Sequence, residues 1–232
     1  MTEIVRLKRL ELALVPRPWT FAEARRDDIA CYFEELRRRK PALWNGRILL
    51  LQEHAIAQDV FRGEYFETDY ASFIAWRDWG YPDPTVKNCF SLGALKGSDG
   101  GFLLGVMGEH TVNAGKVYFP AGTPDPGDVV DGRVDLAGSI RRELAEETGI
   151  GVDAYDAEEG WYCILSGSGI AQIKVLRARE TADALRARVL AHLASEHAPE
   201  LSDIRIARGP ADLDPMMPPY ISAFLTHVWG AP

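Results

Sequence analysis

The sequence predicts an α+β fold, a mixed α/β/α sandwich in which separate helices pack against sheets. Strand-like and helix-like segments are mixed along the chain, with no internal repeat, which is typical of helices layered on sheets. The composition, 47% hydrophobic and 26% charged, is that of an ordinary soluble globular protein. At 232 residues the chain can bury a sizeable core and needs no disulfide or metal to fold.

Hydrophobic spacing and turn signals place the elements of the first third of the chain. Prolines after position 15 end an imperfectly alternating segment, and an Asn-Gly pair marks a turn before two alternating runs. Ser, Thr or Asp before an apolar stripe of helical spacing marks a helix start. The expected elements are a strand at 4–15, a helix at 21–39 capped by Thr20, strands at 47–53 and 57–66, and a helix at 70–79 capped by Asp69.

The same kinds of signal place the elements in the remaining two thirds of the chain, after a Gly- and Pro-rich segment at 80–84. That segment is the best candidate boundary, so we expect an N-terminal α/β extension or small domain at 1–84 and a larger domain at 85–232. The expected elements of the larger domain are strands at 86–95, 102–109 and 116–119, a loop at 121–132, a helix at 135–148, a hairpin of 162–165 with 170–177, a helix at 181–197, a strand at 204–207 and a helix at 218–228.

Charge and cysteine usage restrict the partners and the compartment. The formal net charge is −8, which argues against binding a nucleic-acid polymer or an acidic membrane surface. The three cysteines are far apart and form no CxxC pair, as in a protein of a reducing cytosol. Charged residues interrupt the start of the chain, and no apolar run is long enough to span a bilayer. We therefore expect a cytoplasmic protein that could form a homodimer.

The segment from Arg142 to Ile150 carries the chemistry. On a helix, Glu143, Glu146 and Glu147 stand at i, i+3 and i+4, so their carboxylates share one face. Like charges so close repel one another, and a hard divalent cation such as Mg²⁺ or Mn²⁺ turns that repulsion into binding. Gly149 stands where a left-handed C-terminal cap belongs. A solvated, charge-laced helix is the alternative reading.

The pattern Arg-Glu-aliphatic-x-Glu-Glu-x-Gly-aliphatic resembles the second half of the Nudix box, the signature of the Nudix hydrolase superfamily. A chance match in a chain of this length is on the order of 10⁻⁵ to 10⁻⁴ at average residue usage. Upstream, the run from Phe119 to Gly122 is similar to the strand end and glycine that open the box. The resemblance implies a Nudix fold over most of the larger domain, with the 1–84 segment as an extension.

Two departures from the family pattern stand out. Val134 occupies the position where the family pattern has a glutamate, and the stretch from Gly122 to Arg142 is longer than usual. Asp131 or Asp135 could supply the missing carboxylate, although Asp135 could equally be the helix N-cap. The loss of one carboxylate also leaves open a catalytically weak, nucleotide-binding regulatory protein.

The resemblance implies divalent-metal-dependent hydrolysis of a nucleoside diphosphate linked to another group, a pyrophosphatase reaction. It makes Glu146 and Glu147 direct metal ligands and Glu143 a third ligand or the general base. It also makes Arg142 the side chain that holds Glu143, and the Gly122 carbonyl a further oxygen ligand. Mg²⁺ or Mn²⁺ is the implied cofactor, and Arg142, Glu143 and Glu147 are the catalytic candidates.

Substrate choice must come from outside the box. The turn from Leu43 to Arg47, with the helix that begins near Tyr70, resembles the branch of the family that acts on UDP-glucose and related sugar nucleotides. A nucleotide sugar is therefore the first expected substrate; ADP-ribose, dinucleotides and coenzyme A are the alternatives. The candidate phosphate-binding cations are Arg47, Arg77 and Lys116.

Overall fold

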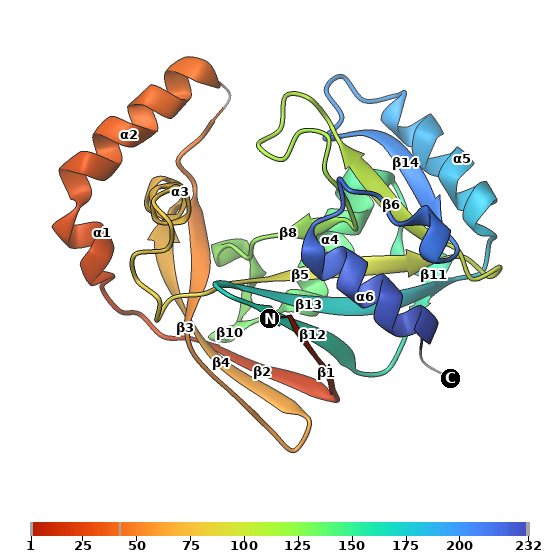
Figure 1. Cartoon of the computed structure of the whole chain (residues 1–232), viewed down its shortest axis with the longest axis horizontal. Coiled ribbons are helices and arrows are strands. Elements are labelled where there is room, and N and C mark those ends of the chain that lie inside the picture. Colours follow the sequence, from red (N-terminus) through yellow and green to blue (C-terminus); the bar gives the residue numbers. More distant parts are fainter. Residues whose placement is uncertain (1, 42, 231–232) are drawn as a thin grey trace. The chain divides into compact units, whose positions relative to one another are not determined.

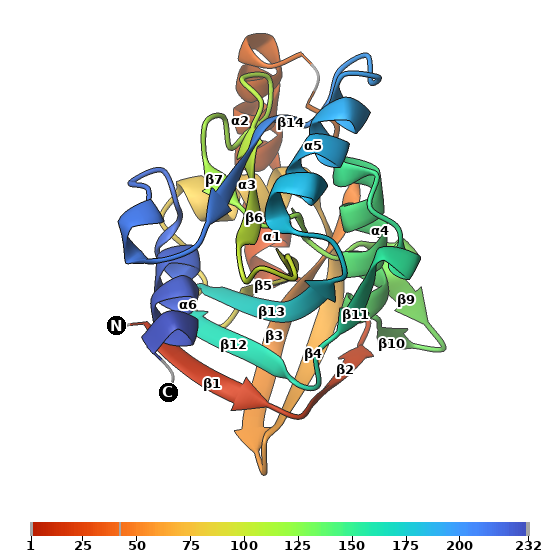
Figure 2. The ribbon, with the colours of Figure 1, turned by 90° about the vertical axis from the view of Figure 1, so that its right-hand side faces the viewer.

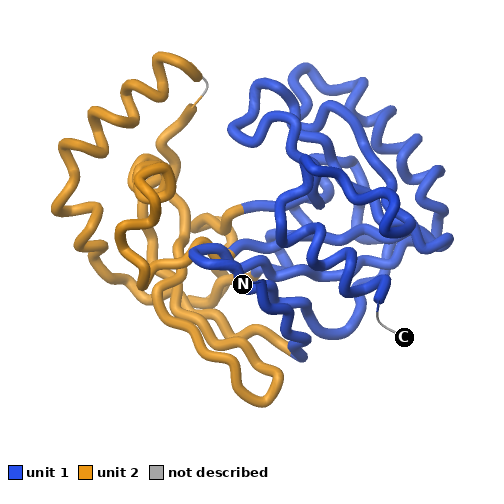
Figure 3. Tube along the Cα trace, viewed as in Figure 1, with its two compact units in different colours: residues 1–8, 90–122, 136–232 blue, residues 9–89, 123–135 orange. Residues whose placement is uncertain are grey.

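The computed structural model describes residues 2–41 and 43–230. In these residues six α-helices and two β-sheets form two compact units, each discontinuous in sequence. Unit 1 comprises 1–8, 90–122 and 136–232, and unit 2 comprises 9–89 and 123–135 (Figure 3). The mixed α/β class predicted from the sequence is confirmed. The division at residue 84 into an extension and a larger domain stays a prediction.

The sheet of unit 1 runs in the order β1-β12-β13-β5-β6-β14, with short strands β11, β7 and β8 added to β13, β6 and β5 (Figure 1). Neighbouring strands in this sheet, such as β12 with β13 and β6 with β14, run antiparallel. The strands are Glu3–Leu7 (β1), Asn88–Lys96 (β5), Phe102–Met107 (β6), Val117–Tyr118 (β7), Ala121–Gly122 (β8), Tyr155–Ala157 (β11), Trp161–Ser166 (β12), Gly169–Ala178 (β13) and Leu201–Ala207 (β14).

Helices cover both faces of this sheet (Figure 2). Phe102 of β6 packs edge-on against Phe224 of α6, while Leu103 shares a small apolar void with residues of α4 and α5. Because successive side chains of a strand point to opposite faces, α6 lies on one face and α4 and α5 lie on the other. The helices are Leu136–Thr148 (α4), Ala182–Leu193 (α5) and Pro219–Gly230 (α6).

Unit 2 is built on a smaller sheet in the order β3-β4-β2-β10-β9. β3 and β4 form a long antiparallel hairpin, and β2 runs parallel to β4. The segment 123–135 joins this unit because Arg133 pairs with Ala13 and the Leu49 amide donates to the Pro124 carbonyl at 2.7 Å. The elements are Arg9–Leu14 (β2), Thr20–Ala24 (α1), Arg26–Arg39 (α2), Arg47–Ala57 (β3), Val60–Asp69 (β4), Tyr70–Asp78 (α3), Val129–Val130 (β9) and Arg133–Val134 (β10).

Three of the expected elements, at 4–15, 21–39 and 121–132, need correction. The single strand at 4–15 is two strands, β1 and β2, which belong to different sheets. The single helix at 21–39 breaks at Arg25 into α1 and α2, and its N-cap is Trp19, with no side-chain cap, in place of Thr20. The loop at 121–132 contains two short strands and a helical turn. Asp69, by contrast, caps α3 as predicted, accepting from the Ser72 amide.

The core of unit 2 is aromatic. Trp76 of α3 is fully buried with Phe66 of β4 and Leu50 of β3, and the rings of Trp19 and Trp76 meet edge to face at 6.0 Å. Aromatic pairs in this geometry add to the burial of their apolar area. Phe73 and Trp76 therefore belong to the core of unit 2. In the described residues no helix is both long enough and apolar enough to cross a membrane.

Candidate functional site

Helix α4 presents its acidic face to the short strand β8. Leu144 is fully buried on the opposite side, and Ile140 packs so closely over Gly93 of β5 that a Cβ there would lie 2.9 Å from its methyl carbon. The helix ends as predicted at Gly149, which has φ +68° and donates to the Ala145 carbonyl. With its apolar side fixed to the sheet, the helix holds Glu143 and Glu147 on adjacent turns beside β8.

Glu147 is an acid placed in the protein interior. The side chain is 7% exposed, and its Oε1 accepts from the Ala121 amide at 3.3 Å. Its Oε2 is buried and has no hydrogen-bond partner among the described residues. Burial, reinforced by the carboxylates of Glu200 and Glu143, raises the pKa of Glu147 to about 9. A buried carboxylate oxygen with no partner among the described residues fits the chemistry of a cation ligand.

Glu143 lies against the other residue of β8. A Cβ added at Gly122 would come within 2.8 Å of the Glu143 carboxyl carbon. Only a glycine at position 122 therefore allows the Glu143 carboxylate to stay where it is. Arg142 donates from Nη1 to Glu143 Oε1 at 2.8 Å. Successive residues of β8, Ala121 and Gly122, therefore contact the carboxylates of Glu147 and Glu143, and this part of the predicted site is brought together.

Glu146 points away from this contact. Its side chain is 63% exposed and, among the described residues, pairs only with Arg142, at 3.5 Å. Among the residues described, no three His, Cys, Asp or Glu side chains converge closely enough to hold a metal ion. The protein thus offers two neighbouring carboxylates and a backbone strand, and no closed cage. That donor set suits Mg²⁺ or Mn²⁺, which binds through one or two carboxylates and takes its other oxygens from water and substrate phosphates.

Glu200 is a further acid, one that sequence reasoning did not find, whose charge acts on Glu147. It stands just before β14, and its carbonyl accepts from the Gly108 amide at 2.8 Å. Desolvation raises the pKa of Glu200, whereas nearby His110 lowers it, and Glu200 acts in turn on Glu147. Tyr118 of β7 also borders Glu147; its hydroxyl accepts from Asn113 at 3.0 Å, and burial raises its pKa. No local motif marks either residue, because strand pairing between distant segments places them: β14 with β6 for Glu200, and β7 with β6 for Tyr118.

The acids of the stretch before α4 have structural tasks. Asp125 and Asp128 form a reciprocal capping box around a helical turn at Pro126–Asp128. Asp131 is exposed in the turn between β9 and β10 with φ +49°, and the Asp135 amide donates to the Asp128 carbonyl. Val134 is buried in β10. That Asp131 or Asp135 supplies the carboxylate missing at Val134 stays a prediction.

The three candidate substrate cations are divided between the two units. Arg47 opens β3 and donates from Nε to Glu67 at 2.6 Å, and Arg77 in the last turn of α3 pairs with Asp78 at 2.7 Å. Both belong to unit 2, whereas Lys116 lies in unit 1, exposed, directly before β7. Arg47 also lines a pocket of about 520 Å³ in unit 2.

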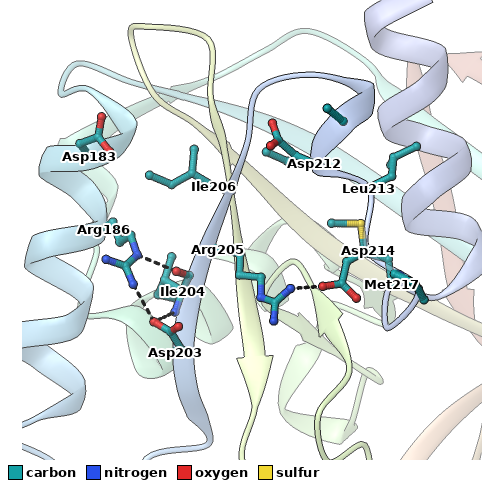
Figure 4. A pocket seen from close by; sticks show the side chains of 13 residues that line it. Asp183, Arg186, Asp203, Ile204, Arg205, Ile206, Asp212, Leu213, Asp214 and Met217 are labelled. Atoms are coloured by element: carbon teal, nitrogen blue, oxygen red, sulfur yellow. Dashed lines mark hydrogen bonds and ion pairs between the residues drawn. The ribbon is translucent and has the colours of Figure 1, made fainter.

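A hollow of about 570 Å³ in unit 1 lies between α5 and the outer edge of β14 (Figure 4). Its arginines are bound to neighbours: Arg186 donates to Asp203 at 2.9 Å and to the Ile204 carbonyl at 2.7 Å, and Arg205 pairs with Asp214. These pairs cover the free edge of β14, which is one way in which proteins protect an edge strand. The hollow is thus explained by the fold.

Comparisons with known proteins give similarity at the level of structure only. No family model matches the sequence, and the search of curated proteins finds no match. Among solved structures, the chain is similar to a Nudix hydrolase from M. smegmatis, RenU, at 14% identity and TM-score 0.39, over 61% of this chain and 81% of that one. It is also similar to a MutT protein from Methanosarcina mazei at 18% identity and TM-score 0.34, over 61% and 91%.

A third solved structure is a bifunctional NMN adenylyltransferase/ADP ribose pyrophosphatase from Francisella tularensis, complexed with AMP and a Mn ion. The similarity has 14% identity and TM-score 0.42, over 68% of this chain and 45% of that one. All three likenesses concern part of the fold, at low identity. The function proposed below is built on the residues of this chain.

Proposed function

We propose that this protein is a Nudix-type pyrophosphatase that uses a divalent cation to hydrolyse a nucleoside diphosphate linked to another group. The observation that carries the proposal is the Glu147 carboxylate, buried with one oxygen unpartnered, beside Glu143 and the backbone of β8. A purely structural acidic helix would turn its carboxylates to solvent, and here two of them turn inward against a strand.

Mg²⁺ or Mn²⁺ would be held by Glu147 and Glu143, with the Gly122 carbonyl as a neutral oxygen. When bound, such a cation supplies charge neutralisation at the phosphates and a bound water of lowered pKa. The open donor set supports binding of the cation together with the diphosphate, because the phosphate oxygens complete the coordination. This also answers how a chain of net charge −8 could accept a polyanion.

The remaining roles follow from the contacts around α4. Arg142 orients Glu143 through the 2.8 Å hydrogen bond, and Glu143 either binds the cation or takes the proton of the attacking water. Glu146, which is exposed and points away from the contact with β8, would contribute only to a cation that the substrate brings from the solvent side. Glu200 adds negative charge beside Glu147 and is a further candidate for the general base.

A nucleotide sugar such as UDP-glucose is the first proposed substrate, and ADP-ribose, dinucleotides and coenzyme A are the alternatives. The test is product formation from a panel of these compounds with Mg²⁺, with Mn²⁺ and with EDTA, in wild type and Glu147→Gln. Metal-dependent release of two phosphorylated halves from one compound, abolished by Glu147→Gln, supports the hydrolase. No turnover of any compound in either metal would contradict it and favour the nucleotide-binding regulatory protein that Val134 leaves open.

A further inference from the structure

Two serine side chains are buried in unit 1 where α4 packs against the sheet. Ser91 of β5 is 1% exposed, and Ser139 of α4 is fully buried. Neither hydroxyl oxygen has a hydrogen-bond partner among the described residues. A buried hydroxyl without a partner has lost its bonds to water, whereas alanine would fill nearly the same space without that loss. The packing of the fold therefore does not explain why both positions carry a hydroxyl.

Strand pairing determines the side to which Ser91 points. Ser91 is paired with Gly122 in the antiparallel contact between β5 and β8. Side chains of directly opposite residues stand on the same face of a sheet, with their Cβ atoms about 5 Å apart. A Cβ at Gly122 would meet the side chain of Glu143. The Ser91 hydroxyl therefore points to the face on which Glu143 lies, next to that side chain.

A second contact indicates the same face independently. Gly93 stands two residues after Ser91, so the two positions share one face of β5. A Cβ at Gly93 would lie 2.9 Å from a methyl carbon of Ile140, so α4 covers this face. Because Ile140 directly follows Ser139, the part of β5 that carries Ser91 lies under the first turns of α4.

Ser139 lies one helical turn before Glu143. Positions i and i+4 are neighbours on one helix face, and long side chains lean back toward the N-terminus, so the Glu143 side chain extends toward Ser139. The Glu143 side chain is 17% exposed, and Arg142, which is 38% exposed, bonds to it at 2.8 Å. Arg142 thus holds Glu143 from the more exposed flank, and the two serine hydroxyls stand on its buried side.

The polar groups around this point suit a water molecule. A buried water makes about three hydrogen bonds. Each serine hydroxyl can donate and accept, and the Glu143 carboxylate accepts, so a single water has three partners here. Neither hydroxyl bonds to Glu143 directly. A water that joins Ser91, Ser139 and Glu143 gives both hydroxyls the partner that the protein groups do not supply.

We propose that Ser91 and Ser139 are positioning residues that hold the Glu143 carboxylate from its buried side through one bound water. With Arg142 on the other flank, the carboxylate is then fixed from both sides. Misplacement of a catalytic group by about 1 Å can cost on the order of 10²-fold in rate, so this support matters for Glu143 as cation ligand or as base. For its catalytic consequence the inference rests on the proposed function, whereas the hydrogen bonds do not depend on turnover.

The first arm of the experiment is structural and needs no substrate. It compares crystal structures of the full chain as wild type, Ser91→Ala and Ser139→Ala, at a resolution that shows bound waters. We expect a water within hydrogen-bonding distance of both hydroxyls and of Glu143 in wild type. In either variant the water should be lost and the Glu143 carboxylate displaced. The proposal is overturned if no water joins the hydroxyls to Glu143, or if Glu143 keeps its position in both variants.

The matched control is Ser72→Ala. Ser72 is likewise a buried serine, 3% exposed, but it belongs to unit 2, where its hydroxyl donates to Asp69 at 3.1 Å. Its removal should leave the position of Glu143 and the kinetic constants unchanged, although the free energy of unfolding falls. Thermal unfolding of all three variants measures that loss, so an effect of stability alone is separated from an effect on Glu143.

The second arm measures steady-state kinetics with a compound that the wild type hydrolyses. Ser91→Ala and Ser139→Ala should each lower kcat about tenfold and change KM less than about twofold, because Glu143 acts in the reaction step. The double variant should be little slower than either single one, since both hydroxyls act through the same water. Unchanged kcat in both single variants would contradict the positioning role. If the wild type hydrolyses no compound, the hydrolase proposal fails by itself, and the crystal structures still decide whether the serines hold Glu143.

Discussion

Gly122 and Glu143 are in such close contact that the glycine has no room for a side chain. A Cβ at Gly122 would lie 2.8 Å from the Glu143 carboxyl carbon, and Glu143 is in turn held by Arg142 at 2.8 Å. The backbone of β8 and an acid of α4 thus determine each other's position.

Gly122→Ala should reduce activity far more than stability. The φ of Gly122 is not in the left-handed region, and the added methyl meets a flexible side chain, so Glu143 can swing aside at a cost of less than about 1 kcal/mol. The displaced carboxylate should lower kcat/KM by on the order of 10²-fold. Gly151→Ala, which has open space around its Cβ, is the control, and an equal loss of activity in both variants would refute the explanation.

Arg142→Met should lower kcat/KM by roughly 10-fold to 100-fold, because Glu143 would lose the charged hydrogen bond that orients it. The Arg142 side chain is 38% exposed, so the free energy of unfolding should change by only about 0.5 kcal/mol. Steady-state kinetics beside Arg141→Met, its exposed neighbour, measure the effect. Full activity of Arg142→Met would contradict the positioning role.

Glu147 makes the stability of the metal-free protein depend on pH. Its pKa is about 9 in the folded state against an ordinary 4.5, so the folded protein binds a proton that the unfolded chain releases. With EDTA present, stability should therefore fall as the pH rises from about 4.5 to about 9. Glu147→Gln should flatten this decline, and Mg²⁺ with a nucleoside diphosphate should oppose it. Thermal unfolding of wild type and Glu147→Gln across that pH range measures the effect. Equal slopes of stability against pH in the two proteins would refute the assignment.

Gly149→Ala should destabilise the protein for two separable reasons. The residue has φ +68°, which costs a non-glycine residue about 1 kcal/mol, and its Cβ would lie 2.7 Å from the His192 ring. Gly132→Ala has the first cost without the second, since Gly132 has φ +74° and open space around it. Chemical denaturation should show a larger loss in the free energy of unfolding for Gly149→Ala than for Gly132→Ala. Equal losses would show that the contact with His192 does not contribute.

Local signals predicted α4 well because everything that defines it lies within about fifteen positions. The apolar stripe, the acidic face and the terminal glycine all act through helical spacing. The same is true of Asp69, whose capping contact is with Ser72, three residues away. The same pattern put Glu143, Glu146 and Glu147 on one face, but it did not show that Glu147 would be buried while Glu146 stays exposed, because that difference depends on β8.

Contacts between distant segments were missed for the opposite reason. The break at Arg25 interrupts a stripe that continues at helical spacing, because Trp19, Phe21 and Ala22 pack into the aromatic core with α3. Glu200 reaches the neighbourhood of Glu147 through the pairing of β14 with β6, which no local pattern encodes. The segment 123–135 likewise joins the sheet of unit 2 through Arg133 and Ala13, which lie far apart in sequence.

The central claim is that Glu147 binds a divalent cation together with a nucleoside diphosphate. Its most direct test is Mn²⁺ binding followed by electron paramagnetic resonance, with and without UDP, in wild type and Glu147→Gln. The account predicts weak binding of Mn²⁺ alone, at least tenfold tighter binding with UDP, and loss of that gain in Glu147→Gln. Equal binding of Mn²⁺ by the two proteins in the presence of UDP would contradict it.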